Sequence, residues 1–309
     1  MGAQNNIQPF DIYRISEEMN ISVKSIENCQ IPLEELEKIY YDHIAHIPDL
    51  ERQRVEILAT LTERASGVVH SIRSRVKEPD HLIGKIVRGA YSNPGKYHLI
   101  NAQNYRKIIT DLIGLRIIIL DRRDWKIVHQ NLLTIYRNIP ERYVHRYSDI
   151  LTNYDLYTEE VSRYDTVPGC AYHAERPVGY ITTEEDRKLY KDEFLLLDSS
   201  KAHYRSLHYI IRYKDVYFEM QMRSLFEEGW LEFDHRMKYP NDRYNKRKEE
   251  YIGILSNLAN AADQLISYYR EEDFEDHSEN MQEEEMHMSS ARDRTLAEGD
   301  LEEKIRILF

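Results

Sequence analysis

The sequence predicts an α+β fold in which helices flank a mixed β-sheet of about five strands. Residues 206–212 and 216–223 alternate apolar and polar side chains around Lys214 and Asp215, which predicts a β-hairpin. Residues 113–120 form a short run rich in isoleucine, typical of a buried strand. Apolar side chains recur at helical spacing in three further segments, residues 124–137, 224–238 and about 245–270.

The N-terminal part is predicted to be helical. Residues 1–30 give only a weak signal, whereas one helical face after Pro32 collects Leu33, Leu36, Ile39 and Tyr40. Pro48 is expected to end that helix. A second helix is predicted over residues 49–74, with a buried stripe of Val55, Leu58, Ala59, Thr62 and Val69.

Shorter elements follow. Asp80 is expected to cap a helix that runs through Arg88 and ends at Gly89. Another helical stretch is predicted near residues 104–110, before the buried strand. Residues 140–200 show little periodicity and read as a lid or binding loop. We therefore expect an N-terminal helical extension (1–48), a central α+β domain (49–240), a C-terminal helix (241–270) and an acidic, disordered tail (271–309).

The formal charge of -12 is concentrated in the tail, where residues 271–300 hold twelve acidic and two basic side chains. The rest of the chain is nearly neutral. A basic cluster inside it, Arg73, Arg75, Lys77, Lys85 and Arg88 with His81, predicts a local anion site.

The two cysteines, Cys29 and Cys170, lack the spacing of a zinc site or a disulfide framework. No basic leader and no run of about 18 apolar residues is present. We expect a cytoplasmic protein with no membrane partner.

Two acidic residues occupy positions suited to metal binding. Asp111 directly precedes the buried strand, and Glu219 lies on the second hairpin strand, where alternation places Glu219, Gln221 and Arg223 on one face. If the two strands are neighbours, both carboxylates can share a Mg²⁺ ion. Each feature also has a structural interpretation: Asp111 as a cap, the hairpin face as a solvated surface, and the basic cluster as the exposed side of a helix.

The order of the motifs favours function. Arg75-Val-Lys77 is followed by Lys85, then by Asp111-Leu-Ile-Gly-Leu-Arg116, Tyr204-Arg205-Ser-Leu-His208 and Glu219-Met-Gln221-Met-Arg223-Ser. In this order, over roughly residues 60–240, the chain resembles the synthetase domain of the RelA/SpoT alarmone synthetases. Trp230 and the pair Asp234-His235 also fit. The resemblance implies a nucleotidyltransferase-like fold with extra N- and C-terminal helices.

The resemblance implies transfer of pyrophosphate from ATP to the 3′-hydroxyl of GDP or GTP, which makes (p)ppGpp and releases AMP. Arg75 and Arg116 match positions that sandwich adenine, and Lys77, Lys85 and, less strongly, Arg88 match positions near the ATP phosphates. Asp111 and Glu219 match the catalytic Mg²⁺ ligands, and Glu219 is also a candidate base. Tyr204 matches the ring that stacks on guanine.

The remaining acceptor residues implied by the family are Arg205, His208, Gln221, Arg223 and Glu228. Tyr204 could instead be a packing ring, and His208 a core histidine. Glu228 stands where small synthetases carry an Asn that contacts guanine. His203 replaces the usual Gly before the Tyr-Arg-Ser motif, so a backbone conformation reserved for Gly would be strained there.

No hydrolase motif is present, so we expect a stand-alone small synthetase. Two alternatives remain: a toxin-type relative that modifies tRNA 3′ ends or adenosine nucleotides, and a degenerate nucleotide sensor. The nearly neutral body disfavours an RNA acceptor, and the retained carboxylates and lysines disfavour the sensor. The stripe Ile252, Leu255, Leu258 and Leu265 suits a homo-oligomer as well as an intramolecular core.

Overall fold

The computed structural model describes residues 8–64, 67–138, 171–192, 194–201, 203–214, 216–238, 247 and 249–270. The chain divides into two compact units, residues 1–260 and 261–309. The first unit contains every element discussed below. In the second, the described residues 261–270 are helical. The predicted acidic tail and residues 139–170 of the predicted lid lie outside the described residues.

The sheet is mixed, which confirms the predicted α+β class. Its main path runs β1-β2-β8-β7-β4-β3, with β5 and β6 attached beside β7. The strands are β1 (Val69–Val76), β2 (Ile113–Ile119), β3 (Arg137–Asn138), β4 (Ala171–His173), β5 (Val178–Tyr180), β6 (Leu196–Asp198), β7 (Ser206–Tyr213) and β8 (Val216–Ser224). The predicted buried strand and hairpin are confirmed. The described residues form eight strands where about five were expected. Three of the eight are only three residues long, which is too short to give a periodic pattern in the sequence.

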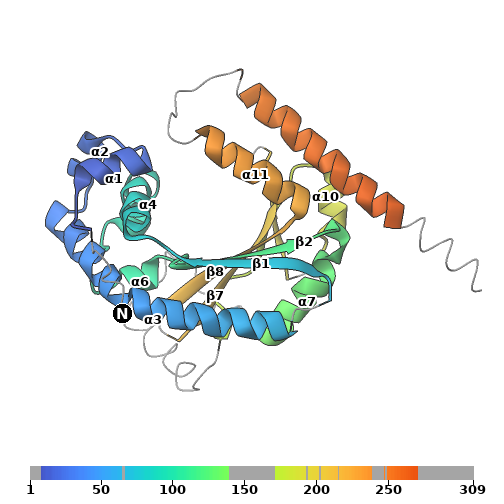
Figure 1. The fold of residues 1–309 in the computed structure, drawn as a ribbon, viewed down its shortest axis with the longest axis horizontal. Coiled ribbons are helices and arrows are strands. Elements are labelled where there is room, and N and C mark those ends of the chain that lie inside the picture. Colours follow the sequence, from blue (N-terminus) through green and yellow to red (C-terminus); the bar gives the residue numbers. More distant parts are fainter. Residues whose placement is uncertain are drawn as a thin grey trace, which may run out of the picture. The chain divides into compact units, whose positions relative to one another are not determined.

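Helices surround this sheet (Figure 1). They are α1 (Ile12–Met19), α2 (Val23–Glu27), α3 (Leu33–Arg64), α4 (Pro79–Ser92), α5 (Pro94–Tyr97), α6 (Tyr105–Ile108), the short 3₁₀ helix η1 (Arg122–Asp124), α7 (Trp125–Ile135), α10 (Glu184–Leu189) and α11 (Leu225–Lys238). Residues 249–270 are also helical. In Figure 1, α3 and α7 lie on one side of the sheet and α11 lies on the other.

The two faces of the central strands differ in chemistry. On β2 and β8 the apolar side chains of Leu115, Ile117, Met220 and Met222 are buried in the main core. Residues between them, such as Arg116, Glu219 and Gln221, point to the opposite face because side chains alternate along a strand. The core therefore fixes the register that presents a polar face toward α11.

The structure corrects the prediction that Pro48 ends a helix. Helix α3 continues from Leu33 through Pro48 to Arg64. Proline removes one helical hydrogen bond, but the helix is buried on both sides of it, through Ile39 and Tyr40 before Pro48 and Leu50 and Ile57 after it. Packing outweighs the local preference of the proline.

The second predicted helix was also partly wrong. Val55, from the predicted buried stripe, is 55% exposed, whereas Ile57 and Leu61 are buried. Helix α3 ends at Arg64, and Val69 belongs to β1, which pairs antiparallel with β2. The basic residues from Arg73 to Lys77 are therefore carried by an edge strand and its end, not by the end of a helix.

The helix predicted to end at Gly89 extends to Ser92. Gly89 lies inside α4 because the Tyr97 ring packs against it: a Cβ there would approach that ring to 2.4 Å. Asp80 does not cap this helix; Glu78 is the N-cap residue, and Asp80 pairs with Arg14 of α1 at 3.0 Å. This partly buried ion pair connects the N-terminal helices to α4.

Other helix predictions agree with the structure. Helices α7 and α11 are confirmed, while the segment predicted near 104–110 is reduced to the four residues of α6. In the final helix Ile252 is buried, but Leu258 is 60% exposed. No helix among the described residues is long and apolar enough to cross a membrane.

Candidate active site

Sheet register brings residues from four strands into two rows on the polar face. In one row, Arg73 pairs with Arg116, Arg116 with Gln221, and Gln221 with His208. In the adjacent row, Gly114 stands between Arg75 and Glu219. Gly114 presents no side chain, and a Cβ built there would meet no atom within 4 Å. The strand order thus leaves an open space beside Glu219.

Asp111 lies just before β2 and forms ion pairs with two lysines. Its carboxylate oxygens lie 2.9 Å from Lys77 Nζ and 2.7 Å from Lys85 Nζ. Burial lowers the pKa of Lys77 and nearby Lys85 lowers it further, while Asp111 raises it. Asp111 therefore balances the charges of two lysines that are held close together.

Glu219 has a different environment. Its Oε1 lies 2.7 Å from His208 Nδ1, and His208 Nε2 lies 2.8 Å from the Tyr204 hydroxyl. The Tyr204 hydroxyl in turn accepts a hydrogen bond of 3.0 Å from Arg223 Nη2. This arrangement assigns the protons: the Tyr204 hydroxyl donates to His208 Nε2, and His208 Nδ1–H donates to Glu219.

The pKa values agree with that assignment. Burial lowers the pKa of His208, which favours the neutral ring. Burial by itself would raise the pKa of Glu219, but the hydrogen bond from His208 outweighs it and lowers the pKa. Glu219 is therefore ionised at neutral pH, and both nitrogens of His208 are engaged.

Both carboxylates line one cleft. A cavity of about 330 Å³ is bordered by Asp111, Glu219 and Gln221 together with Arg75, Lys77 and Arg116. A second cavity, of about 400 Å³, shares Arg75, Lys77, Asp111 and His235 with the first and extends to Lys85, Arg88 and the end of α1. The two cavities are parts of one cleft with a strongly basic wall.

All five predicted donor residues border this cleft. Arg88 also donates a hydrogen bond of 3.0 Å to the carbonyl of Met19, so α1 contributes to the wall. Arg116 is 33% exposed and pairs with Glu228 and Glu232 of α11. The basic cluster of the sequence is thus one wall of this cleft and not the solvated side of one helix.

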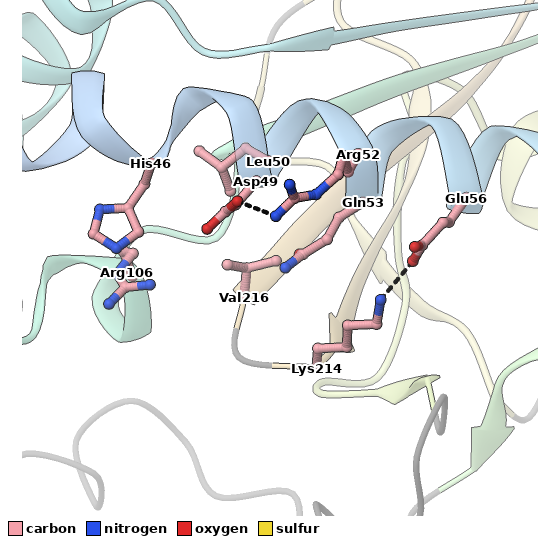
Figure 2. A pocket seen from close by; sticks show the side chains of 9 residues that line it. All are labelled: His46, Asp49, Leu50, Arg52, Gln53, Glu56, Arg106, Lys214 and Val216. Atoms are coloured by element: carbon pink, nitrogen blue, oxygen red, sulfur yellow. Dashed lines mark hydrogen bonds and ion pairs between the residues drawn. The ribbon is translucent and has the colours of Figure 1, made fainter.

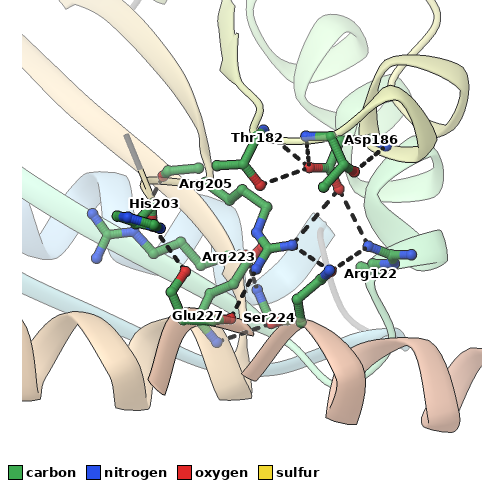
Figure 3. A network of polar contacts seen from close by, with 12 residues as sticks. Arg122, Thr182, Asp186, His203, Arg205, Arg223, Ser224 and Glu227 are labelled. Carbon is green, nitrogen blue, oxygen red and sulfur yellow. Dashed lines mark hydrogen bonds and ion pairs between the residues drawn. The ribbon is translucent and has the colours of Figure 1, made fainter. Parts of the chain in front are cut away.

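The predicted acceptor residues separate into two groups. Tyr204, His208, Gln221 and Arg223 lie together on the polar face, joined by the hydrogen bonds above and by one from Arg223 to Gln221. Arg205 points away from them and is 4% exposed; it pairs with Glu227 at 3.3 Å and contacts Asn260 (Figure 3). Glu228 is also 4% exposed and binds Arg116 and Arg223 from behind.

The position of Arg205 follows from backbone geometry. Consecutive residues of an extended chain point to opposite sides, so Tyr204 and Arg205 cannot share one pocket. Arg205 instead joins a buried network with Arg122, Asp186 and Glu227 (Figure 3). This network supports the start of β7 and the C-terminal helix, a structural role that the family motif did not reveal.

The structure adds residues that the sequence interpretation missed. The Tyr180 ring on β5 lies 4.8 Å from the His208 ring and 5.4 Å from the Tyr204 ring. Lys201 Nζ lies 3.6 Å from the centre of the Tyr180 ring and 4.8 Å from that of Tyr204. Tyr180 falls in a segment without periodicity, so no local signal could have identified it. The three rings meet edge to face, with interplanar angles of 69°, 80° and 64°, so they line an aromatic corner in which each ring has its own orientation.

A separate pocket of about 160 Å³ lies between α3, α6 and the hairpin tip (Figure 2). Lys214 Nζ binds Glu56 there at 2.6 Å, and Arg52 pairs with Asp49. The Tyr213 hydroxyl also donates to Glu56, at 2.7 Å. These contacts tie the hairpin to α3, and we assign this pocket no part in the candidate site.

The cleft suits a magnesium ion bound together with phosphate. Among the described residues, no three His, Cys, Asp or Glu side chains gather into a complete metal site. Mg²⁺ characteristically takes one or two carboxylates and completes its shell with water and substrate phosphates. Asp111 and Glu219 supply two carboxylates on the same cleft, so the donor set fits this ion.

Comparisons with known proteins give one family. The family model described as the region found in RelA/SpoT proteins matches residues 74–244. No curated protein matched the sequence.

Solved structures with a similar fold include small alarmone synthetase 1 from Bacillus subtilis bound to its product pppGpp, at 16% identity and a TM-score of 0.44, covering 75% of this chain and 94% of that one. A GTP pyrophosphokinase family protein from Streptococcus pneumoniae matches at 14% identity and a TM-score of 0.42, covering 78% and 95%. Small alarmone synthetase 2 from Bacillus subtilis matches at 16% and 0.38, covering 75% and 97%. Because the family model spans more than half of the chain, this protein belongs to the RelA/SpoT family.

Proposed function

We propose that this protein is a magnesium-dependent pyrophosphokinase that transfers the β,γ-pyrophosphate of ATP to the 3′-hydroxyl of GDP or GTP. One observation carries the proposal: in a chain of the RelA/SpoT family, Asp111 and Glu219 border a single cleft whose wall is basic. The acceptor 3′-oxygen forms a bond to the β-phosphorus. The bond between that phosphorus and the α,β-bridging oxygen breaks, AMP leaves, and the hydroxyl proton passes to solvent.

The donor side of the cleft suits a polyphosphate. Lys77 and Lys85 already lie within 3 Å of a carboxylate, and phosphate oxygens can replace that carboxylate as their partner. Arg75 and Arg116 lie on neighbouring strands, which supports the proposal that their planar guanidinium groups hold the adenine ring between them. Arg88 extends the positive wall toward α1.

The acceptor side suits a base and a ribose. Tyr204 and Tyr180 offer ring faces, and Gln221 and His208 lie beside them. A lowered pKa makes Glu219 a weak proton acceptor. We therefore assign Glu219 to holding Mg²⁺ rather than to removing the hydroxyl proton early in the reaction.

Mg²⁺ held by Asp111 and Glu219 would neutralise charge on the transferred phosphates. Phosphoryl transfer through a loose transition state requires alignment and charge neutralisation more than a strong base. Lys77 and Lys85 serve that requirement directly by binding phosphate oxygens. A weak base at position 219 is thus compatible with rapid transfer.

The test is product identification. Purified protein is incubated with labelled ATP and Mg²⁺ and with GDP, GTP, AMP or tRNA in separate reactions. We expect labelled pyrophosphate on GDP or GTP and an equal amount of AMP. Labelled tRNA or a labelled adenosine product would assign the toxin-type activity instead. Nucleotide binding without AMP release would identify a sensor.

A further inference from the structure

Glu228 joins two arginines through the two oxygens of one carboxylate. Its Oε1 accepts a hydrogen bond of 2.8 Å from Arg116 Nη1, and its Oε2 accepts one of 2.9 Å from Arg223 Nη1. The Glu228 side chain is only 5% exposed. A third arginine, Arg73, lies 3.8 Å from Oε1 but is largely exposed.

The two arginines belong to opposite sides of the cleft. Arg116 borders the donor cavity and is 33% exposed. Arg223 is 4% exposed and binds the hydroxyls of Tyr204 and Ser206 at 3.0 and 3.1 Å. An unbroken series of hydrogen bonds therefore leads from Arg116 through Glu228 and Arg223 to the ring of Tyr204.

Sharing one buried carboxylate makes the positions of the two arginines interdependent. A desolvated charge interacts strongly with its partners, and loss of one partner strengthens its dependence on the other. We propose that Glu228 is a positioning residue that couples donor binding at Arg116 to acceptor binding at Tyr204. This inference rests on the proposed function, since it requires that one chain bind both nucleotides.

The direction of coupling follows from the contacts. Adenine stacked on the face of the Arg116 guanidinium leaves its N–H edge bonded to Glu228 and restricts the movement of both side chains. Arg223 is then held more firmly, and its Nη2 orients the Tyr204 hydroxyl for the incoming acceptor. Donor binding should therefore tighten acceptor binding, by about 5-fold or more if the coupling has the usual size. Linkage requires the reciprocal effect on the donor.

Glu232 provides a matched control. It is one helical turn from Glu228 on α11 and also pairs with Arg116, but it is 45% exposed, and no contact with Arg223 is observed among the described residues. Glu232→Gln removes a carboxylate from the donor side only. It should change the affinity for the donor while the coupling factor persists.

The experiment is titration calorimetry with a non-hydrolysable ATP analogue and GDP, each alone and each in the presence of the other. For the unaltered chain and Glu232→Gln we expect GDP to bind about 5-fold or more tightly when the analogue is present. For Glu228→Gln the ratio should fall to about 1. Should Glu228→Gln fail to unfold cooperatively, Glu228→Asp replaces it: aspartate keeps the charge but is too short to reach both arginines, so the ratio should also fall.

Three results would overturn the inference: a ratio of 1 in the unaltered chain, an unchanged ratio in a folded Glu228 variant, or equal loss of coupling in Glu232→Gln. Failure of the unaltered chain to bind one of the nucleotides would contradict the proposed function and the coupling with it. Binding of both nucleotides with AMP release but without coupling would contradict only the role of Glu228.

Discussion

Asp111 and Glu219 border the same cleft with nearly equal exposure, 16% and 19% of the side chain, yet their partners differ. Two lysine ammonium groups bind Asp111, whereas a neutral imidazole that is itself held by Tyr204 binds Glu219. Ion pairs on the donor side can be exchanged for phosphate without disturbing the backbone. The acceptor side is instead a connected series of hydrogen bonds, which favours a fixed geometry before substrate arrives.

The largest test of this contrast is removal of each carboxylate. Asp111→Ala and Glu219→Gln should each reduce pyrophosphate transfer by about 1000-fold, because both carboxylates border the cleft in which we propose that transfer occurs. AMP release from ATP and acceptor measures the effect. Both variants should still unfold cooperatively by circular dichroism. Activity like that of the unaltered chain in either folded variant would place the site elsewhere.

We expect low pH to lower the free energy of unfolding through a buried histidine beside β7. His173 on β4 pairs with β7, is 3% exposed, and burial lowers its pKa to about 4. Because the unfolded chain binds this proton near pH 6.5 and the folded chain does not, the free energy of unfolding should fall as pH drops from about 6.5 to 4, by up to about 3 kcal/mol from this group.

Urea unfolding at pH 7 and pH 4.5 measures that loss. His173→Leu should reduce the difference between the two pH values, since leucine cannot take up a proton. An equally steep pH dependence in this variant would assign the effect to other groups.

Substitution of Tyr204 should affect the KM for the acceptor nucleotide more than the KM for the donor. Tyr204→Ala should raise the KM for GDP by about 30-fold, as expected for loss of one stacking ring, while the KM for ATP changes by less than about 2-fold. Tyr204→Phe retains the ring and should show a smaller effect. Steady-state kinetics with each substrate varied in turn measures both values. Equal changes in both KM values would mean that the tyrosine is a packing residue of the whole cleft.

The smallest expected effect concerns His203, where the family usually has Gly. Its φ is 60°, the left-handed region that favours glycine. Its carbonyl accepts a 3.3 Å hydrogen bond from the Ser256 hydroxyl, and Gly253 packs against its ring. His203→Ala keeps the strain and loses the ring contact, so it should be about 1 kcal/mol less stable than His203→Gly. Equal urea midpoints for the two variants would show that the backbone there is not strained.

Local sequence patterns were sufficient to predict the central strands of the sheet. The isoleucine run of β2 and the alternation of β7 and β8 each identify a strand without reference to the rest of the chain. Strand β1 was missed because apolar and polar side chains do not alternate regularly along Val69–Val76. Its burial in the structure is irregular in the same way. Strands β4, β5 and β6 span three residues each, too short for a periodic signal.

The site was predictable where residue type and order are diagnostic, as for Asp111, Glu219 and the basic residues. It was not predictable where orientation depends on tertiary contacts. Arg205 and Glu228 stand at positions of the family pattern, but both side chains are buried. Arg205 pairs with Glu227, and Glu228 lies between Arg116 and Arg223. Tyr180 reaches the acceptor face only because β5 pairs with β7.

The unbroken course of α3 past Pro48 has a practical consequence for anyone who shortens this chain. His43, six residues before residue 49, where the sequence alone would suggest a cut, is fully buried, with its Nε2 2.7 Å from the carbonyl oxygen of Lys77. A fragment that begins at residue 49 would lose this support for Lys77, together with the Arg14–Asp80 pair. The leading helices thus form part of the wall of the cleft, and a fragment that keeps the cleft must include them.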